Sequence, residues 1–417
     1  MRKHFAAMAV VCALAAPALV MTRAPAATSD QQKFEEIEHG RYLATLADCT
    51  ACHTKKDGGK PFAGGREIET PFGMVLSANI TPDRDTGIGN WTEQQFANAL
   101  LHGIRPDGSR LYPAMPYTAY TKMSRDDVKA IRAYLATLEP VHNRVVTNQL
   151  PFPFNIRLAM RGWDLLFFDD GRFKPDPKKS AQWNRGAFIV TGPGHCGACH
   201  TPKNFLGADK TDKALQGGQV QGWFAPDITN DKMQGLGDMS IDDVAKILKT
   251  GHNSIAAVTG PMGEEVADAS AHFSEDDLKA IATYLKSLPG ADEQRASLDK
   301  SDPRMVAGQA IYRDTCSACH GLDGKGIANL FPALAHSPAA RASDPTTAIR
   351  IVLRGARSVA TKGEPTAPAM PSYGWQLKDD QVAAVLTYIR NSWGSASPPV
   401  EAGAVGKQRS KLANRTD

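Results

Sequence analysis

Apolar residues recur at helical spacing in three segments that lie far apart in the chain. In segments 124–138, 274–288 and 377–393 they fall on one face of a helix, and acidic residues near each start suit the positive end of the helix dipole. Serine precedes the acidic residues in the first two segments and predicts an N-cap at Ser124 and Ser274. We therefore expect three amphipathic helices that each bury one apolar face.

A shorter helical pattern with a glycine lies well before each of these segments. The glycines are Gly40, Gly186 and Gly308, each followed within ten residues by a cysteine. A glycine allows another helix to cross closely, because it has no Cβ. Each later helix carries a tyrosine in the same place, which we expect to pack against the glycine-bearing helix: Tyr134, Tyr284 and Tyr388. The paired patterns indicate an internal repeat of three helical units.

The chain of 417 residues is too long for one small core and fits about three units of ordinary domain size. The repeats place these units at residues 31–140, 181–290 and 302–394. Each is expected to be a small helical bundle, so the predicted fold class is all-α.

Three segments lie between or after the repeats. Residues 141–180 form an aromatic and apolar linker, which either packs across the adjoining domains or provides a docking surface for a partner or the membrane. Residues 291–301 form a short polar linker. Residues 395–417 are rich in small residues, proline and charge, so we expect a disordered tail.

The N-terminus carries the pattern of a secretory leader. Arg2 and Lys3 precede an apolar run at residues 5–21, and Ala24-Pro25-Ala26 offers a small-residue cleavage site. Residues 1–26 are therefore expected to be a signal peptide. An uncleaved membrane anchor is the alternative, because an apolar run of about 17 residues approaches the length that spans a bilayer.

Composition changes this picture little. Charged residues make up 22% of the chain and the formal net charge is +4. These values are typical of a globular protein. So weak a net charge gives no sign of a nucleic-acid partner.

Six of the seven cysteines form three pairs with two residues between them, and a histidine follows each pair directly. The motifs are Cys49-Thr-Ala-Cys52-His53, Cys196-Gly-Ala-Cys199-His200 and Cys316-Ser-Ala-Cys319-His320. The seventh, Cys12, lies in the leader. It would be the lipidated first residue of a lipoprotein, but Ala9 and Val11 match that signal poorly.

A Cys-x-x-Cys-His sequence is typical of covalent haem attachment. Its thiols lie within one helical turn, where both add to the vinyl groups of one haem, and the adjacent histidine reaches the iron from the same side. Disulfides, zinc sites and thioredoxin-like redox pairs also use paired cysteines, but none needs a histidine directly after the second cysteine. We therefore predict three covalently bound haem c groups, with His53, His200 and His320 as iron ligands.

A methionine in each repeat offers a second axial ligand, and a thioether opposite histidine raises the reduction potential of the haem. The three lie in proline-bearing loops before the last helix of each repeat: Met115, Met262 and Met370. The separation from the haem-binding histidine is 62 residues in the first two repeats and 50 in the third. Equal spacing in two repeats favours a shared role.

Other candidate side chains have weaker support. His102 and His252 flank aligned glycines on opposite sides, so they are not equivalent positions. At the second site His252 or His272 could replace the thioether, because only one proline accompanies Met262. Trp91 could donate its indole hydrogen to a haem propionate or simply pack in the core.

Each unit resembles a class I cytochrome c, and the series of three is similar to the multihaem cytochrome subunit of membrane-associated bacterial dehydrogenases for alcohols, gluconate, fructose, sorbitol or glucose. The resemblance covers roughly Phe34 to Gly394. Its distinctive stretches are Lys60-Pro-Phe-Ala-Gly-Gly65, Thr70-Pro-Phe-Gly73, Asn79-Ile-Thr-Pro-Asp83 and Tyr112-Pro-Ala-Met-Pro-Tyr117, echoed by Gln216-Gly-Gly218 and Pro226-Asp-Ile-Thr-Asn230.

The resemblance implies an electron-transfer subunit and not an enzyme. A separate quinoprotein or flavoprotein dehydrogenase subunit would oxidise the substrate, and this chain would pass the electrons to ubiquinone or another respiratory acceptor. It also implies a periplasmic location at the outer face of the cytoplasmic membrane. Relatives often attach through an apolar C-terminal segment, whereas residues 395–417 are polar here. Attachment through the partner, through the aromatic stretch near Trp163 or through an uncleaved leader is therefore the expectation.

Two other functions stay open from the sequence. The chain could be a free-standing periplasmic electron shuttle or an oxidase-linked cytochrome. It could also be a multihaem peroxidase-like enzyme, which would need one iron with a displaceable ligand. The loop around Met262 is the weakest of the three sites in this respect.

Overall fold

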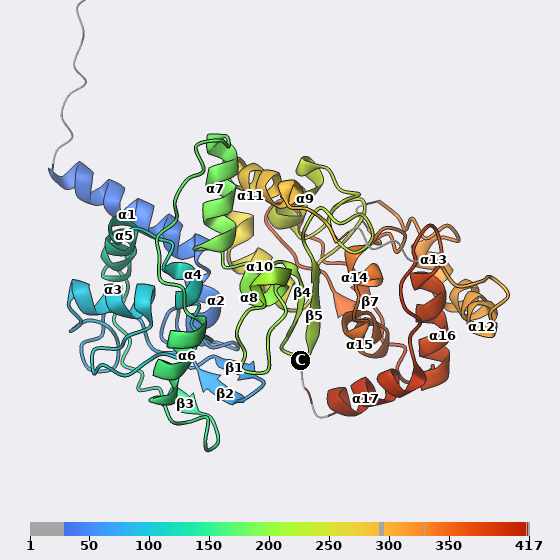
Figure 1. The fold of residues 1–417 in the computed structure, drawn as a ribbon, viewed down its shortest axis with the longest axis horizontal. Coiled ribbons are helices and arrows are strands. Elements are labelled where there is room, and N and C mark those ends of the chain that lie inside the picture. Colours follow the sequence, from blue (N-terminus) through green and yellow to red (C-terminus); the bar gives the residue numbers. More distant parts are fainter. Residues whose placement is uncertain (1–28, 292–295, 329, 414, 416–417) are drawn as a thin grey trace, which may run out of the picture.

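The computed structural model describes residues 29–291, 296–328, 330–413 and 415. The expected signal peptide at residues 1–26, with Cys12, lies outside the described residues. Helices dominate the described part, and the three repeats follow one another along the molecule, from blue at one end to red at the other (Figure 1). The predicted all-α class is confirmed, and small sheets that the sequence did not indicate accompany the helices.

Each unit is built on a crossing pair of helices formed by its two predicted segments. The pairs are α1 (Ser29–Leu46) with α5 (Arg125–Leu135), α7 (Ala181–Thr191) with α11 (Glu275–Ser287), and α12 (Pro303–Ile311) with α16 (Asp379–Arg390). The predicted caps are confirmed, because Ser124 and Ser274 accept hydrogen bonds from the backbone N–H of Asp127 and Asp277.

The predicted close crossing of these helices is confirmed in all three pairs. A Cβ added to Gly40, Gly186 or Gly308 would come within 1.8, 1.9 or 2.2 Å of a backbone oxygen on the facing helix. The Cβ atoms of Tyr284 and Tyr388 would lie 2.9 and 2.7 Å from the added atom in the second and third pairs. Only glycine fits at such a crossing.

The remaining elements surround these pairs. Further helices are α2 (Cys49–His53), α3 (Glu93–His102) and α4 (Tyr117–Tyr120) in the first unit, α8 (Gly197–His200), α9 (Ile241–Thr250) and α10 (Pro261–Asp268) in the second, and α13 (Ser317–His320), α14 (Pro338–Arg341) and α15 (Thr346–Arg354) in the third. Short 3₁₀ or π turns occupy Thr211–Lys213, Ser270–His272 and Tyr312–Cys316.

A small antiparallel sheet accompanies each unit. The strands are β1 (Glu67–Thr70), β2 (Gly73–Leu76) and β3 (Asn148–Gln149), then β4 (Gln216–Val220) with β5 (Trp223–Asp227), and β6 (Ala356–Arg357) with β7 (Ala369–Met370). In the first two units the sheet follows the cysteine motif, with Glu67 opposite Leu76 and Val220 opposite Trp223.

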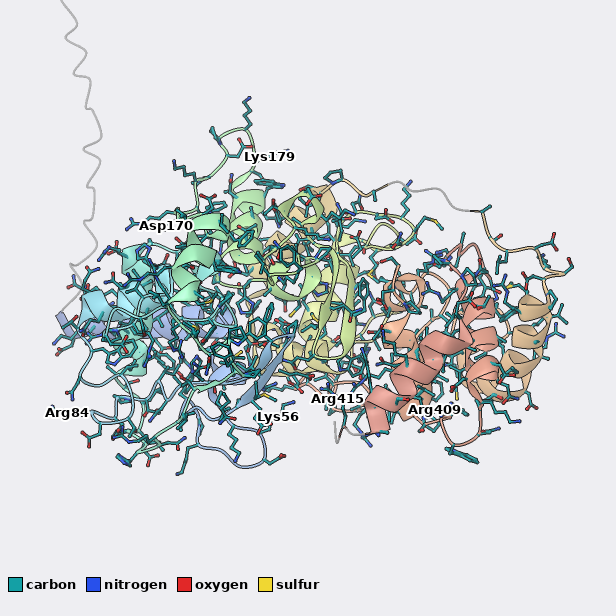
Figure 2. All side chains as sticks on the ribbon, turned by 60° about the horizontal axis from the view of Figure 1, so that its bottom comes forward. Lys56, Arg84, Asp170, Lys179, Arg409 and Arg415 are labelled. Atoms are coloured by element: carbon teal, nitrogen blue, oxygen red, sulfur yellow. The ribbon has the colours of Figure 1, made fainter. Side chains whose placement is uncertain are left out.

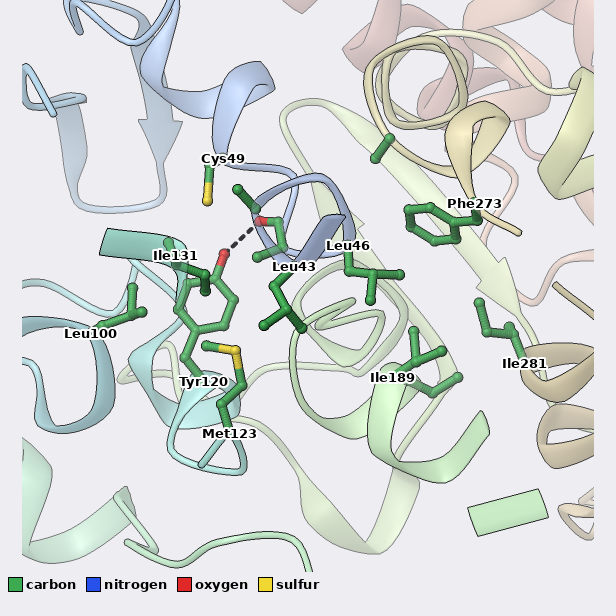
Figure 3. Close-up of a cluster of buried hydrophobic side chains, with 14 of the residues drawn as sticks. Leu43, Leu46, Cys49, Leu100, Tyr120, Met123, Ile131, Ile189, Phe273 and Ile281 are labelled. Carbon is green, nitrogen blue, oxygen red and sulfur yellow. Dashed lines mark hydrogen bonds between the residues drawn. The ribbon is translucent and has the colours of Figure 1, made fainter. Parts of the chain in front are cut away.

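The first and second units share one hydrophobic core. Leu43 and Leu46 of α1 belong to the same buried cluster as Ile189 of α7 and Ile281 of α11 (Figure 3). The third unit has a separate cluster, which is centred on α15 and α16. The first two units are therefore coupled through apolar packing. The contacts of the third unit with the second include the ion pair of Arg341 with Asp238 and the β-bridge of Ser358 with Thr259.

The aromatic linker packs across the first two units. Its helix α6 (Ala159–Phe167) buries Trp163, whose indole Nε1 donates to the carbonyl oxygen of Leu206 at 3.0 Å. The hydroxyl of Tyr117 donates to the neighbouring Asp164 at 2.6 Å. The outer side of the same helix leaves Leu165 87% exposed.

The expected disordered tail is wrong for residues 402–413, which form α17 (Ala402–Ala413). Val405 and Leu412 are 0% and 2% exposed, and α17 packs against α15 and α16. Seven residues separate the two side chains, so they lie on one helical face. Arg415, which follows α17, pairs with Glu69 of the first unit at 2.6 Å. Figure 2 labels Arg415 and Arg409 of this C-terminal region. Composition did not reveal this narrow apolar face.

None of the helices in the described ranges combines the length and the apolar character needed to cross a membrane.

Candidate haem-binding sites

Each Cys-x-x-Cys-His motif forms a single helical turn at the wall of a cavity. These turns are α2, α8 with the preceding Cys196, and α13 with the preceding Cys316. All six cysteines line a cavity, and none of them is in a disulfide. The turn therefore presents two thiols and one imidazole to the same space, as the sequence predicts.

Burial governs the chemistry of the thiols. It raises the pKa of Cys49, Cys52 and Cys196 to about 12, and that of Cys199 and Cys316 to about 11. A thioredoxin-like redox pair uses a thiolate of lowered pKa, which such burial disfavours. In the part of the chain that the structure describes, no three His, Cys, Asp or Glu side chains are arranged as a metal site. The zinc and thioredoxin-like alternatives do not fit this geometry.

A backbone carbonyl orients the histidine of each motif. The pairs are Nδ1 of His53 with O of Ala78 at 2.7 Å, Nδ1 of His200 with O of Pro226 at 2.7 Å, and Nδ1 of His320 with O of Pro332 at 3.0 Å. An Nδ1–H that donates to a carbonyl leaves Nε2 free to bind iron. Burial lowers the pKa of all three imidazoles and favours the neutral form that a metal ligand needs.

The first two of these carbonyls begin a repeated turn that sequence reasoning noticed only as an echo. Oδ1 of Asn79 accepts from the backbone N–H of Thr81 at 3.0 Å, and Oδ1 of Asp227 accepts from that of Thr229 at 2.6 Å. Such an Asx turn fixes the chain direction directly after the carbonyl that meets the histidine. The repeated sequence therefore positions the histidine that is predicted to bind iron.

The predicted methionines lie in the same cavities as their histidines. A cavity of about 1430 Å³ is lined by the first two motifs together with Met115 and Met262. A cavity of about 130 Å³ is lined by the third motif and Met370. Two thiols, an imidazole and a thioether form a donor set that fits a covalently bound haem at each motif.

The local structure of these methionines differs from the prediction at two sites. Met115 lies in a turn, as expected. Met262 lies in the first turn of α10, and Met370 lies in strand β7. The predicted loop is wrong for Met262 because Pro261 has a fixed φ that suits the first position of a helix.

The other histidines that were considered as iron ligands lie away from the second motif. Neither His252 nor His272 lines the cavity that holds His200. His272 is exposed, and His102 pairs with Asp170 at 3.0 Å. His252 is buried and lines the cavity of the third unit instead.

Several basic side chains of the larger cavity were not predicted from the sequence. Arg66, whose side chain is 13% exposed, donates to the carbonyl oxygen of Ala51 at 2.7 Å and pairs with Glu264 of α10. Further cations line this cavity: Arg105, Arg157 and Lys203. Trp91 lines it as well, and its role as a donor stays a prediction. No motif marks these cations in the sequence.

Comparisons with known proteins agree with the haem chemistry. The model of the cytochrome c family matches residues 37–139 and 305–393. The chain is 39% identical to the cytochrome c subunit of alcohol dehydrogenase (quinone) from Gluconacetobacter polyoxogenes, over 89% of this chain and 84% of that protein. It is also 39% identical to the gluconate 2-dehydrogenase cytochrome c subunit of Pantoea cypripedii, over 89% of each chain.

A third relative extends the same pattern. The fructose dehydrogenase cytochrome subunit of Gluconobacter japonicus is 37% identical, over 89% of this chain and 82% of that protein. These alignments extend over most of both chains, so they support the resemblance and the role of an electron-transfer subunit in place of a catalytic one. The chain belongs to the family of cytochrome c subunits of bacterial dehydrogenases.

Proposed function

We propose that the protein binds three covalent haems and carries electrons from the catalytic subunit of a dehydrogenase to ubiquinone or another respiratory acceptor. One observation carries the proposal: two sets of two thiols, one imidazole and one thioether line the larger cavity, and a third such set lines the smaller one. A bound haem supplies one-electron reduction and oxidation there. The three relatives are named as subunits of alcohol, gluconate and fructose dehydrogenases. These names support a dehydrogenase catalytic subunit as the partner.

The two cavities adjoin within the molecule. Ala257, Val258, Thr259 and Ile351 line both of them. The first two motifs already share the larger cavity, so the residues common to both linings connect the third site with the other two. This placement supports electron transfer along the whole series.

Purification together with the dehydrogenase subunit encoded next to this chain tests the proposal. Addition of alcohols or sugars to the complex should reduce the haems, which visible absorption spectra would show. If the haems stay oxidised with every dehydrogenase that is encoded nearby, the proposal is wrong. Reduction by a dehydrogenase that never co-purifies would favour a free-standing shuttle.

The location is proposed to be the periplasm, at the outer face of the cytoplasmic membrane, with residues 1–26 removed as a signal peptide. In the described part of the tail, Val405 and Leu412 of α17 are buried, so these apolar side chains are not available for attachment. Helix α6 offers such side chains, since Leu165 is 87% exposed and Leu158, directly before the helix, is 68% exposed. Within α6, Arg161 is exposed and Asp164 is buried, so the helix presents a positive charge that suits an anionic lipid surface.

Vesicle binding tests this face of α6. Vesicles that contain anionic phospholipid should bind the parent protein, and Leu165→Glu should weaken binding several-fold. Leu322→Glu is the matched control, because Leu322 is also exposed but lies in the third unit. Equal binding of both variants would reject the face. If Leu165→Glu abolishes co-purification with the dehydrogenase and leaves vesicle binding intact, the face belongs to the protein partner.

A further inference from the structure

We propose that His252, a residue of the second unit, completes the third haem-binding site by donating a hydrogen bond to a propionate carboxylate of the third haem. The inference rests on the proposed function, because it assumes a haem at the third motif. His252 follows Gly251, the left-handed C-cap of α9, and is 6% exposed. It lines the cavity formed by Cys316, Cys319 and His320.

The backbone around His252 is fixed against the third unit. His252 forms a β-bridge with Ala257, and Thr259 forms another with Ser358 of the third unit. A Cβ on Gly251 would come within 2.1 Å of Val359, so the two units are in close contact here. The position of the imidazole at the third cavity therefore follows from backbone pairing between the units.

Polar groups at this side of the third site have unmet hydrogen-bonding capacity. Nε2 of His252 lies 4.0 Å from the carboxylate of Glu364, which is longer than a hydrogen bond. The hydroxyl oxygens of Ser358 and Thr361 are buried without a hydrogen-bond partner, and Ser358 lines the same cavity. Buried polar groups in native proteins are normally paired. The imidazole of His252 and the hydroxyls of Ser358 and Thr361 are donors that fit a ligand that accepts hydrogen bonds.

The charges of the two cavities differ in a way that assigns this role to His252. Arg66, Arg105, Arg157 and Lys203 line the larger cavity, whereas no lysine or arginine is among the described residues that line the smaller cavity of the third unit. Within that lining, His252 and His320 carry the two imidazoles, and Nδ1 of His320 lies 3.0 Å from the carbonyl oxygen of Pro332. A buried carboxylate needs such a donor. His252 is therefore the group that supplies it.

A redox titration of the full chain with its three haems tests the inference. His252→Leu removes the donor, and His252→Gln keeps one. His272→Leu is the control, because His272 belongs to the same unit, is exposed and lines neither cavity. Loss of the donor leaves more negative charge near the iron and favours its oxidised form. We expect His252→Leu to lower the reduction equilibrium constant of one haem about tenfold, which is about 59 mV for one electron.

The expected pattern includes the other variants. His252→Gln should retain most of the parent potential, and His272→Leu should match the parent at all three haems. Loss of the third haem in His252→Leu, with its retention in His252→Gln, would also support the inference. Unchanged titration in His252→Leu, or equal shifts in the Leu and Gln variants, would overturn it. Fewer than three haems in the parent protein would instead reject the proposed function.

Discussion

The hydroxyl of Tyr42 in the first unit donates a hydrogen bond of 2.7 Å to the carboxylate of Asp277 in the second unit. Arg185 pairs with the same carboxylate at 2.8 Å. Burial alone would raise the pKa of Asp277, but the hydrogen bonds from Arg185 and Tyr42 outweigh it and lower that pKa. The carboxylate therefore joins the two units in its ionised form.

This contact predicts an acid-sensitive link between the units. Because the pKa of Asp277 is lower in the folded state than in the unfolded state, its stabilisation is present above about pH 4 and is lost as the pH falls through the folded pKa. Asp277→Asn should lower the free energy of unfolding at pH 7 by about 1 kcal/mol, a small value because Arg185 is partly exposed. Denaturant unfolding at pH 7 and pH 3 measures this difference, which should shrink at pH 3. Asp276→Asn, on the exposed side of α11, is the control, and a difference independent of pH would contradict the account.

A substitution at the helix crossing tests the packing of the second unit. Gly186→Ala places a methyl group within 1.9 Å of the carbonyl oxygen of Ala280, so the helices must separate. We expect a loss of about 1–3 kcal/mol in the free energy of unfolding. Gly403→Ala in α17 meets no atom within 4 Å and should stabilise by about 0.5–1 kcal/mol. Thermal or denaturant unfolding compares the two, and a stabilised Gly186→Ala would refute the close crossing.

The axial thioether at the second site is tested by Met262→Leu, which keeps nearly the same volume. Loss of the ligand should lower one of three reduction potentials by on the order of 0.1 V, within the span of about 0.8 V that axial ligands control. Met233→Leu is the control, because Met233 lines neither cavity. If the titration of Met262→Leu matches that of the parent, Met262 is not a ligand.

The tail provides a further test. Leu412→Ala should lower the free energy of unfolding of the third unit by about 2–5 kcal/mol, because the side chain is buried against its core. Lys411→Ala, at an exposed neighbouring position, should change stability by less than about 0.5 kcal/mol. Unfolding curves that coincide for the two variants would show that α17 contributes nothing to the third unit.

The sequence was sufficient for features that depend on local spacing. The close crossings at Gly40, Gly186 and Gly308 follow from repeated helical patterns, and so do the caps at Ser124 and Ser274. The repeats also assigned one methionine to each motif, and the three methionines do line the cavities that hold the motifs. Their role as iron ligands stays a prediction.

Features that depend on contacts between units were not predictable in the same way. His252 belongs to the second unit of the chain but lines the cavity of the third motif, since backbone pairing between Thr259 and Ser358 brings the units together. The tail has a polar composition, and only its packing shows that Val405 and Leu412 share one buried face. Sequence spacing carries no information about such distant surfaces.

The number of covalent haems is the central claim, and the mass of the processed chain measures it directly. Intact mass spectrometry of the denatured, acid-acetone-extracted protein, with pyridine haemochrome absorbance for quantity, should give an increase equal to three haems. An increase equal to two or fewer, or no haemochrome absorbance after extraction, would contradict the account.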